Sequence, residues 1–354
     1  MSSLYEKIIR PVLFAMDAES AHLAAATSLR IMGKIPLAGA AVSLFCRSDP
    51  APVRLFGLEF SNPIGLAAGM DKSAEFPLAA AALGFGHMEI GTVTPLRQLG
   101  NAKPRLFRYP ETDALVNRMG FNNDGAEAIA DRIARNYPKG KRPSPLGINL
   151  GKAKTTPLEQ AAEDYLASFK ILADHADYLV VNVSSPNTRN LRDLQEAENL
   201  DPLVAALCEA NEERTRKLGR PKAPILLKVS PDESFRSLDA ILEIVQARNL
   251  DGIVAANTTV SRQDPGAENC SESGGLSGAP LRKRSTETVR YLSKATEGRL
   301  PIIGVGGILD ASHAAEKLDA GASLVQVYTG LVYKGPLFAK RLARALSRRG
   351  ENWI

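Results

Sequence analysis

The chain has few of the residues on which disulfide frameworks and metal sites depend. Its 354 residues include three cysteines and four histidines, and no two cysteines have the CxxC spacing. The histidines, at positions 22, 87, 175 and 313, fall in no metal-ligand spacing. We therefore expect free thiols in a reducing compartment and no protein-bound metal.

Long apolar runs and basic, aromatic-rich stripes are also missing. The longest uncharged apolar run near the start, residues 35–46, is well below the roughly 20 residues that span a bilayer. Charged residues and Pro11 interrupt the first twenty positions, which argues against a signal peptide. The net charge of +5 comes partly from residues 340–349 and 139–142, where no aromatic residues are interleaved. We expect solvated surfaces there and no nucleic-acid binding.

A repeating unit begins near residue 53: a short apolar run, a loop rich in Gly, Pro and Asn, and a helix-like stretch. Each unit predicts a parallel strand with a right-handed crossover. The eight predicted strands are residues 64–68, 88–92, 146–150, 178–184, 225–229, 252–256, 301–305 and 323–328. Eight strands over about 280 residues predict an α/β fold of the (β/α)8 TIM-barrel type. A doubly wound sheet is the alternative, but its dinucleotide fingerprint is missing.

Residues 1–50 do not belong to this repeat and predict a small N-terminal helical extension to a barrel domain at 51–354. A short helix is expected at 3–14 and an apolar third one at 36–45. Between them, Asp17 is placed to cap a second helix, with Glu19 in its first turn. Two interpretations are open: a helical plug over the barrel floor, or an amphipathic module that meets a membrane surface and admits an apolar ligand.

The segment 178–188 is the most informative stretch. It begins as a buried parallel strand and then delivers polar side chains into a turn that Pro186 makes rigid. Those side chains are Asn182, Ser184, Ser185 and Asn187. No His/Asp relay or GxSxG elbow accompanies Ser185, so acyl transfer is not expected. As a base, this hydroxyl would need an electron-accepting cofactor nearby.

Two loops late in the chain predict a phosphate site. The glycine-rich residues 304–308 follow the seventh strand and 328–330 follow the eighth, where TIM barrels usually bind phosphate. Lys72 and Lys228 lie at or within strand ends, where a buried ammonium needs an anion or a polar ring. The N1/C2 edge of a flavin beside the phosphate would be such a partner.

Asparagines recur at the same level of the predicted barrel and suit a planar polar substrate with amides and a carboxylate. They are Asn117, Asn122, Asn149, Asn182, Asn187 and Asn257. Each could instead be a turn residue. A non-redox lyase or isomerase with a phosphorylated substrate, and a non-enzymatic flavin-binding or membrane scaffold, are the competing interpretations.

Motifs in order along the chain resemble those of dihydroorotate dehydrogenases of the quinone-dependent, membrane-associated class 2. They lie at 62–72, 89–95, 103–108, 117–123, 147–152, 182–188, 257–259, 274–278, 304–308 and 327–330. The resemblance implies a TIM barrel with one FMN per chain that oxidises (S)-dihydroorotate to orotate in de novo pyrimidine (UMP) synthesis. A serine base would remove the C5 proton, hydride would pass from C6 to flavin N5, and a membrane quinone would reoxidise the flavin.

The resemblance also implies roles for individual residues, with Ser185 as the catalytic base. FMN would be held by Ala68, Gly69, Met70, Asp71, Lys72, Thr92, Asn149, Asn182, Lys228, Ala256, Gly278, Gly307, Tyr328 and Thr329. Dihydroorotate would be held by Lys72, Asn117, Arg118, Met119, Gly120, Phe121, Asn182, Asn187, Asn257 and Thr258. His22 and Arg105 would lie along a quinone tunnel. Thr188 and Phe121 would order a water path from Ser185.

The soluble class of the family carries cysteine, with its more acidic thiol, where this chain has Ser185. The serine and the helical prefix both favour the quinone class over a soluble fumarate- or NAD-linked enzyme. The expected partners are dihydroorotate and orotate, ubiquinone or menaquinone, and a membrane surface. The expected protein is a monomer, peripheral on the cytoplasmic face of the cell (inner) membrane. The chain departs from the family's usual pattern at two places. Arg189-Asn190 stands where Pro-Gly is common in bacterial relatives, and Ala256 stands where threonine is frequent.

Overall fold

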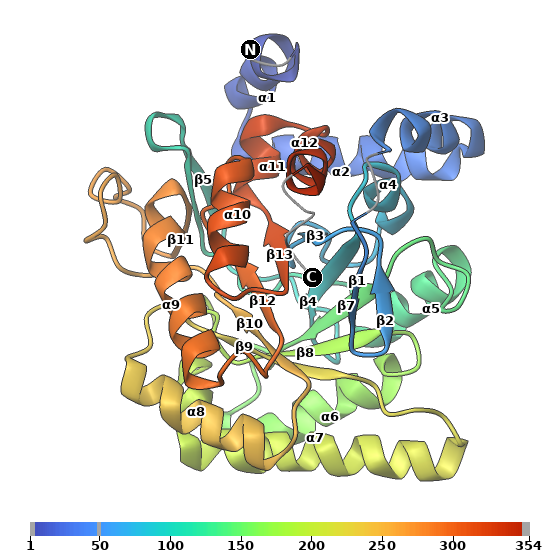
Figure 1. Cartoon of the computed structure of the whole chain (residues 1–354), viewed down its shortest axis with the longest axis vertical. Coiled ribbons are helices and arrows are strands. Elements are labelled where there is room, and N and C mark those ends of the chain that lie inside the picture. The colour runs from blue at the N-terminus through green and yellow to red at the C-terminus, as the bar shows by residue number, and fades with distance from the viewer. Residues whose placement is uncertain (1–3, 48–50, 349–354) are drawn as a thin grey trace.

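A closed barrel of eight parallel strands forms the centre of the molecule (Figure 1). The computed structural model describes residues 4–47 and 51–348. Around the barrel the strand order is β10–β12–β13–β3–β4–β7–β8–β9. The strands are β3 (Ile64–Leu66), β4 (His87–Val93), β7 (Leu146–Leu150), β8 (Tyr178–Asn182), β9 (Ile225–Val229), β10 (Gly252–Ala255), β12 (Ile302–Val305) and β13 (Leu324–Val327). All eight overlap the predicted strands, so the TIM barrel is confirmed.

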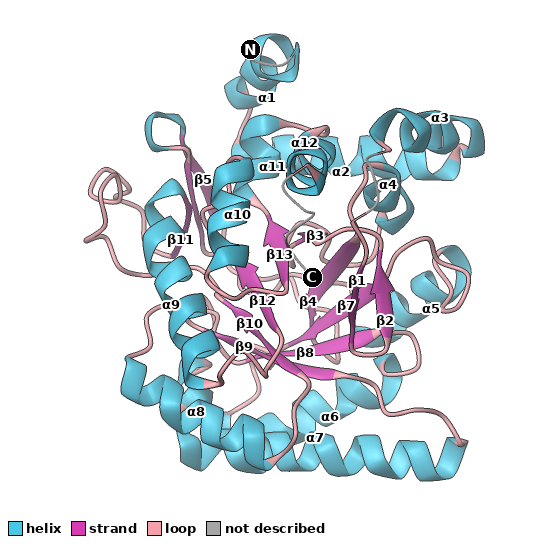
Figure 2. Ribbon diagram, viewed as in Figure 1, coloured by secondary structure: helices cyan, strands magenta, loops and turns pink. Residues whose placement is uncertain are grey.

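Helices cover the outside of the barrel (Figure 2). Outward-facing strand residues such as Met88 and Ile90 pack in one large apolar core with residues such as Ile129 and Ile133, one helical turn apart. The helices are α4 (Pro77–Ala82), α5 (Ala126–Asn136), α6 (Ala161–Leu172), α7 (Ala197–Leu218), α8 (Phe235–Ala247), α9 (Arg282–Ala295), α10 (Ala311–Asp319), α11 (Thr329–Lys334) and α12 (Phe338–Ser347). Short 3-10 turns occur at Pro110–Thr112, Leu158–Gln160, Arg192–Gln195 and Ala279–Leu281.

The floor of the barrel is closed by a two-stranded hairpin, β1 (Val53–Leu55) and β2 (Leu58–Phe60). Phe60 is fully buried and packs edge-on against His87 at the start of β4, with 5.4 Å between ring centroids. Phe56 of the connecting turn packs 6.3 Å from Tyr178 at the start of β8. A hairpin therefore occupies the position that one interpretation of the sequence assigned to the N-terminal helices.

The N-terminal helices lie instead beside the opposite, carboxyl-terminal side of the barrel. They are a π-helical turn at Tyr5–Ile9, α1 (Arg10–Ala15), α2 (Ala18–Lys34) and α3 (Pro36–Cys46) (Figure 1). Asp17 caps α2 as predicted, accepting a hydrogen bond from Ser20 N at 2.9 Å. Tyr5 Oη donates to Val332 O of α11, which follows the last barrel strand. The floor-plug interpretation is therefore wrong: these helices contact α4, α11 and β5.

Pro11 lies in the first turn of α1, directly after the π-helical turn Tyr5–Ile9. Within residues 4–47 and 51–348, no single helix has the length and hydropathy to cross a membrane. The helices α2 and α3 reach that threshold only when taken together, and they are bent by 105°.

A three-stranded sheet that the sequence analysis did not predict overhangs the barrel. Strands β5 (Leu106–Tyr109), β6 (Ala114–Asn117) and β11 (Gly275–Gly278) pair antiparallel in the order β11–β6–β5. Its register places Asn117 opposite Gly275, which is distant in sequence. The first two strands flank a tight turn, and that local pattern could have indicated a hairpin. The pairing of β6 with β11 joins segments that are distant in sequence, so no local sequence pattern predicts it.

Candidate functional site

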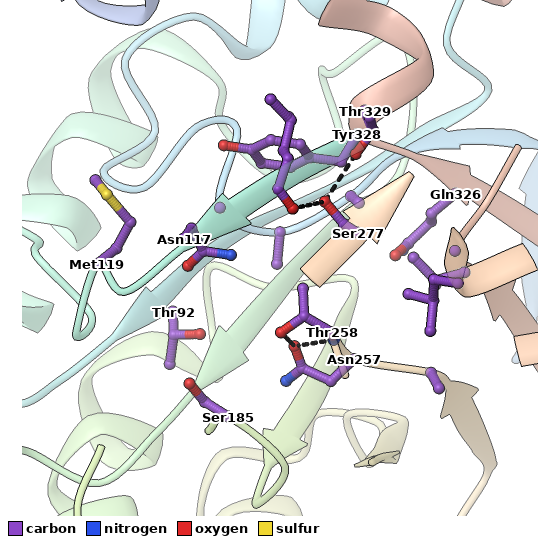
Figure 3. A pocket seen from close by; sticks show the side chains of 18 of the residues that line it. Thr92, Asn117, Met119, Ser185, Asn257, Thr258, Ser277, Gln326, Tyr328 and Thr329 are labelled. Atoms are coloured by element: carbon purple, nitrogen blue, oxygen red, sulfur yellow. Dashed lines mark hydrogen bonds between the residues drawn. The ribbon is translucent and has the colours of Figure 1, made fainter. Parts of the chain in front are cut away.

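A cavity of about 1090 Å³, its open mouth included, lies at the carboxyl ends of the barrel strands (Figure 3). The barrel strands form its floor and the β5–β6–β11 sheet contributes Leu115, Asn117, Ser277 and Gly278. Most predicted site residues line it: Ala68, Gly69, Lys72, Thr92, Asn117, Met119, Gly120, Phe121, Asn182, Ser185, Asn187, Lys228, Ala256, Asn257, Thr258, Gly278, Gly307, Tyr328 and Thr329. Sequence positions from all parts of the barrel therefore converge on one space.

Four of the predicted FMN and substrate residues do not line this cavity. Asn149 lies beneath its floor, and Met70 is part of the apolar core. The carboxylate of Asp71 accepts backbone N–H groups of Glu75 and Phe76 at 2.9 and 3.0 Å, and thereby shapes the loop that carries Lys72. Arg118 turns outward and pairs with Glu272 at 2.9 Å.

One end of the cavity is a cradle that only glycine can form. Gly307 has a φ of +71°, and a Cβ there would lie 2.3 Å from Arg282 Cα. Gly278 has a φ of +97°, and a Cβ there would lie 2.2 Å from Asp113 O. Glycine is therefore required at both positions by the backbone conformation and the neighbouring main chain, and neither position places a side chain in the cavity. Hydroxyls of Ser277 and Thr329, 2.9 Å apart, border the same space, and Ser277 was not predicted.

The floor contains a buried ion pair. Lys228 Nζ lies 3.2 Å from Glu89 Oε1, and both side chains are almost fully shielded from solvent. Glu89 also accepts from Asn149 Nδ2 at 2.7 Å and from Gln326 Nε2 at 2.9 Å. Sequence reasoning singled out Lys228 and missed Glu89, although a carboxylate inside the apolar strand β4 carries the same signal.

Amide side chains connect the floor to the substrate side of the cavity. Asn149 Oδ1 accepts from Thr92 Oγ1 at 2.5 Å and from Asn182 Nδ2 at 3.0 Å. Asn182 Oδ1 in turn accepts from Asn257 Nδ2 at 3.3 Å. Across the cavity, Asn187 Nδ2 donates to Asn117 Oδ1 at 3.1 Å. The cavity wall thus contains a network of neutral donors and acceptors.

Ser185 is buried at the cavity wall, and its Oγ accepts a hydrogen bond from Asn187 N at 3.3 Å. Within the described chain, no carboxylate, imidazole or amine is hydrogen-bonded to this oxygen. The nearby Thr188 Oγ1 is buried and has no partner among the described residues. Asn190, at the tip of the same loop, has a φ of +57°, a conformation that glycine and asparagine tolerate best.

Lys72 and His22 are both shifted toward their neutral forms. Burial lowers the pKa of Lys72 to about 8, although the charge of Glu19 opposes this shift. Lys72 Nζ donates to Gly69 O at 2.8 Å. Burial also lowers the pKa of His22 to about 3, and the charge of Lys72 adds to the effect. His22 is therefore a neutral imidazole.

Arg105 and Glu19 connect the N-terminal helices to the cavity. Arg105 Nη2 lies 2.7 Å from Glu19 Oε1 of α2, and both side chains are buried. Next to this pair, Ala18 packs with Leu106 and Met119, which line the cavity. Neither His22 nor Arg105 lines the cavity itself. Among residues 4–47 and 51–348, no group of three or more His, Cys, Asp or Glu side chains is arranged to hold a metal ion.

Comparison with known proteins gives consistent matches. The family model for dihydroorotate dehydrogenase matches residues 51–349. A dihydroorotate dehydrogenase (quinone) from Synechococcus sp. (strain JA-2-3B'a(2-13)) is 48% identical, over 98% of this chain and 94% of the relative. One from Christiangramia forsetii is 49% identical, over 98% and 100%. The crystal structure of the Eimeria tenella enzyme in complex with ferulenol superimposes with a TM-score of 0.78 at 35% identity, covering 90% of this chain and 93% of that one.

The lowered pKa of Lys72 predicts that an anionic ligand binds more weakly at alkaline pH. In the free protein this ammonium is charged below about pH 8 and neutral above it. We expect the dissociation constant of orotate to be nearly constant below about pH 7 and to increase by up to roughly tenfold per pH unit above pH 8. Titration of the purified protein with orotate measures this. Lys72→Met is the control and should bind orotate weakly at every pH. If the dissociation constants of the wild type and the variant changed with pH in parallel, the pH dependence would not come from Lys72.

Proposed function

The chain belongs to the dihydroorotate dehydrogenase family, in its quinone-dependent class 2, and we propose that it oxidises (S)-dihydroorotate to orotate on one bound FMN, with Ser185 as the base. The family assignment makes it an oxidoreductase. The observation that carries the finer proposal is the convergence of Ser185, Lys72 and Lys228 on one cavity beside the glycine cradle.

The residues present fit FMN. The phosphate would lie in the cradle of Gly278, Gly307 and Thr329, where backbone groups approach closely. Lys228 would meet the polar edge of the ring, and Ala68, Gly69, Ala256 and Tyr328 would flank it. Asn149, below the floor, would act by orienting Thr92 and Asn182. When bound, FMN supplies a two-electron acceptor.

The substrate would lie against the amide wall. Lys72 would pair with its carboxylate, while Asn117, Asn187, Asn257 and Thr258 would match the ring amides. The backbone of Gly120 and the side chains of Met119 and Phe121 would complete the pocket. Arg118 would act only indirectly, because its side chain is engaged by Glu272.

Ser185 Oγ would take the C5 proton of the substrate. The N–H of Asn187, which already donates to this oxygen, would stabilise negative charge that develops there. The unpartnered hydroxyl of Thr188 and the ring of Phe121 would order a water path that carries the proton away.

The N-terminal helices would form a module that meets a membrane surface and admits the quinone. They expose large apolar side chains, including Leu4, Leu37 and Leu44, which are 70%, 85% and 74% exposed. A quinone passing α2 would reach Leu106 and Met119 at the cavity edge, with neutral His22 and the Arg105–Glu19 pair nearby. The proposed module spans residues 1–50 and the barrel 51–354; their boundary falls at residues outside the described ranges.

The protein would be peripheral on the cytoplasmic face of the cell (inner) membrane, and would act as a monomer with ubiquinone or menaquinone as acceptor. Its role would be the redox step of de novo pyrimidine synthesis.

An anaerobic visible spectrum tests the function directly. The purified protein should show the bands of bound FMN, lose them on addition of dihydroorotate and regain them on addition of a ubiquinone analogue. Bleaching without recovery by quinone would contradict the quinone-linked half-reaction. A protein that neither contains nor takes up FMN would overturn the proposal.

Replacement of the base tests Ser185. Ser185→Ala should slow flavin reduction by dihydroorotate by about 10²–10⁴-fold while FMN remains bound, because no other group accepts the C5 proton. Anaerobic stopped-flow absorbance measures the rate. Ser168→Ala, which removes a buried hydroxyl without a partner in the described chain, is the matched control and should reduce at the wild-type rate. A wild-type rate in Ser185→Ala would remove Ser185 as the base.

Charges on the apolar surface of α3 test the membrane module. The double variant Leu37→Glu/Leu44→Glu should bind vesicles of phosphatidylethanolamine and phosphatidylglycerol at least about tenfold more weakly. The reason is that the favourable free energy of transferring the two leucine side chains from water to the membrane interface is lost. Vesicle co-sedimentation measures this, and turnover with a water-soluble quinone analogue should be unchanged. The control is Leu218→Glu at the end of α7, a leucine that is 53% exposed. Equal vesicle binding by the wild type, the double variant and Leu218→Glu would contradict the proposal that the N-terminal helices contact a membrane.

A further inference from the structure

Glu89 is a buried carboxylate that lies next to the cavity but does not line it. It lies in β4 with its side chain inside the barrel and none of it exposed to solvent. Its carboxylate accepts hydrogen bonds from three other strands: Asn149 on β7, Lys228 on β9 and Gln326 on β13. A carboxylate can only accept, so each of these side chains is oriented with a donor toward Glu89.

Two of these partners form part of the cavity floor. Lys228 and Gln326 line the cavity, while Glu89 lies beneath them and is itself shielded from the ligand. The charge of Lys228 is therefore opposed by a negative charge 3.2 Å away, in a region where solvent screens neither group. Any group above this floor experiences the ion pair and not an isolated ammonium.

We propose that Glu89 is a positioning residue that holds Lys228 at the cavity floor and, through its negative charge, lowers the reduction potential of the bound flavin. This rests on the proposed function, because it requires FMN above Lys228. The lysine stabilises the negative charge that the ring gains on reduction, whereas Glu89 limits this stabilisation. Electrons therefore leave the reduced flavin for the quinone more readily than an uncompensated lysine would allow.

The surrounding hydrogen bonds make the charge removable without disrupting the site. In Glu89→Gln the carbonyl oxygen can still accept from Lys228 and Asn149, which share Oε1 in the wild type. The new NH2 group would face Gln326. Gln326 Oε1 makes no hydrogen bond of normal geometry in the part of the chain that the structure describes, and its neighbour is the Tyr178 hydroxyl, which can donate or accept; the Gln326 amide can therefore rotate and accept.

The test is the two-electron midpoint potential of bound FMN, measured by anaerobic spectroelectrochemical titration. Glu89→Gln should retain FMN and have a more positive potential. We expect at least a tenfold change in the ratio of reduced to oxidised flavin at a given solution potential, which is about 30 mV for a two-electron couple. The matched control is Glu59→Gln, which removes an exposed carboxylate of the β1–β2 hairpin at the opposite end of the barrel. It should keep the wild-type potential. Reoxidation by a ubiquinone analogue should be slower in Glu89→Gln alone.

A Glu89→Gln protein with the wild-type potential, or a more negative one, would overturn the inference. If wild-type protein is not bleached by dihydroorotate, the proposed function itself fails; if it is bleached and the variant keeps the wild-type potential, only the role of Glu89 fails. Should the variant not fold, neutron diffraction from deuterium-exchanged wild-type crystals decides the matter. A deuteron on the Glu89 carboxyl would refute the charge effect, and a bare carboxylate facing a fully deuterated Lys228 ammonium would support it.

Discussion

Closure of eight short strands into one barrel is the constraint on which the rest of this structure depends. The interior is narrow, and two large inward rings near its floor each lie against a glycine of a neighbouring strand. A Cβ at Gly147 would lie 2.3 Å from the ring of Tyr178, and one at Gly65 would lie 2.1 Å from His87 Nε2. Above these rings the same closure brings Glu89 and Lys228 together from different strands. Each charge is tolerated in the interior because the other is there.

The roof of the site depends on a different set of contacts. The β5–β6–β11 sheet brings Asn117 and Ser277 over the barrel mouth, and Arg105, which precedes β5, is held by Glu19 of α2. Removing one partner of such a buried pair typically costs about 3–5 kcal/mol. The N-terminal helices are therefore joined to the cavity by a charge pair as well as by apolar packing. Any quinone route along α2 would share this border with the substrate pocket.

Charge in the site is arranged at two levels. Lys72, at the side of the cavity, has its pKa lowered to about 8 by burial, and the proposed anionic substrate would meet it there. Lys228, in the floor, is paired with Glu89, and the proposed flavin would lie above it. Between them the polar wall is built of amides and hydroxyls, which can hold a planar ring without adding charge of their own. Ser185 Oγ accepts a hydrogen bond from Asn187 N, and among the described residues no charged group is hydrogen-bonded to it.

Much of this protein could be predicted from its sequence, because the relevant signals are local. Apolar runs followed by Gly, Asn and Ser residues predicted the eight strands and the polar residues at their ends, and the capping of α2 by Asp17 is contained in a few neighbouring residues. The motifs also identified the family. The tertiary structure decided what depends on contacts between distant segments: the hairpin, not the helices, on the floor; the pairing of β6 with β11; the outward turn of Arg118; and the partners of Glu89. Register and charge pairing across a closed barrel arise only when all strands are in place, so no single stretch of sequence contains them.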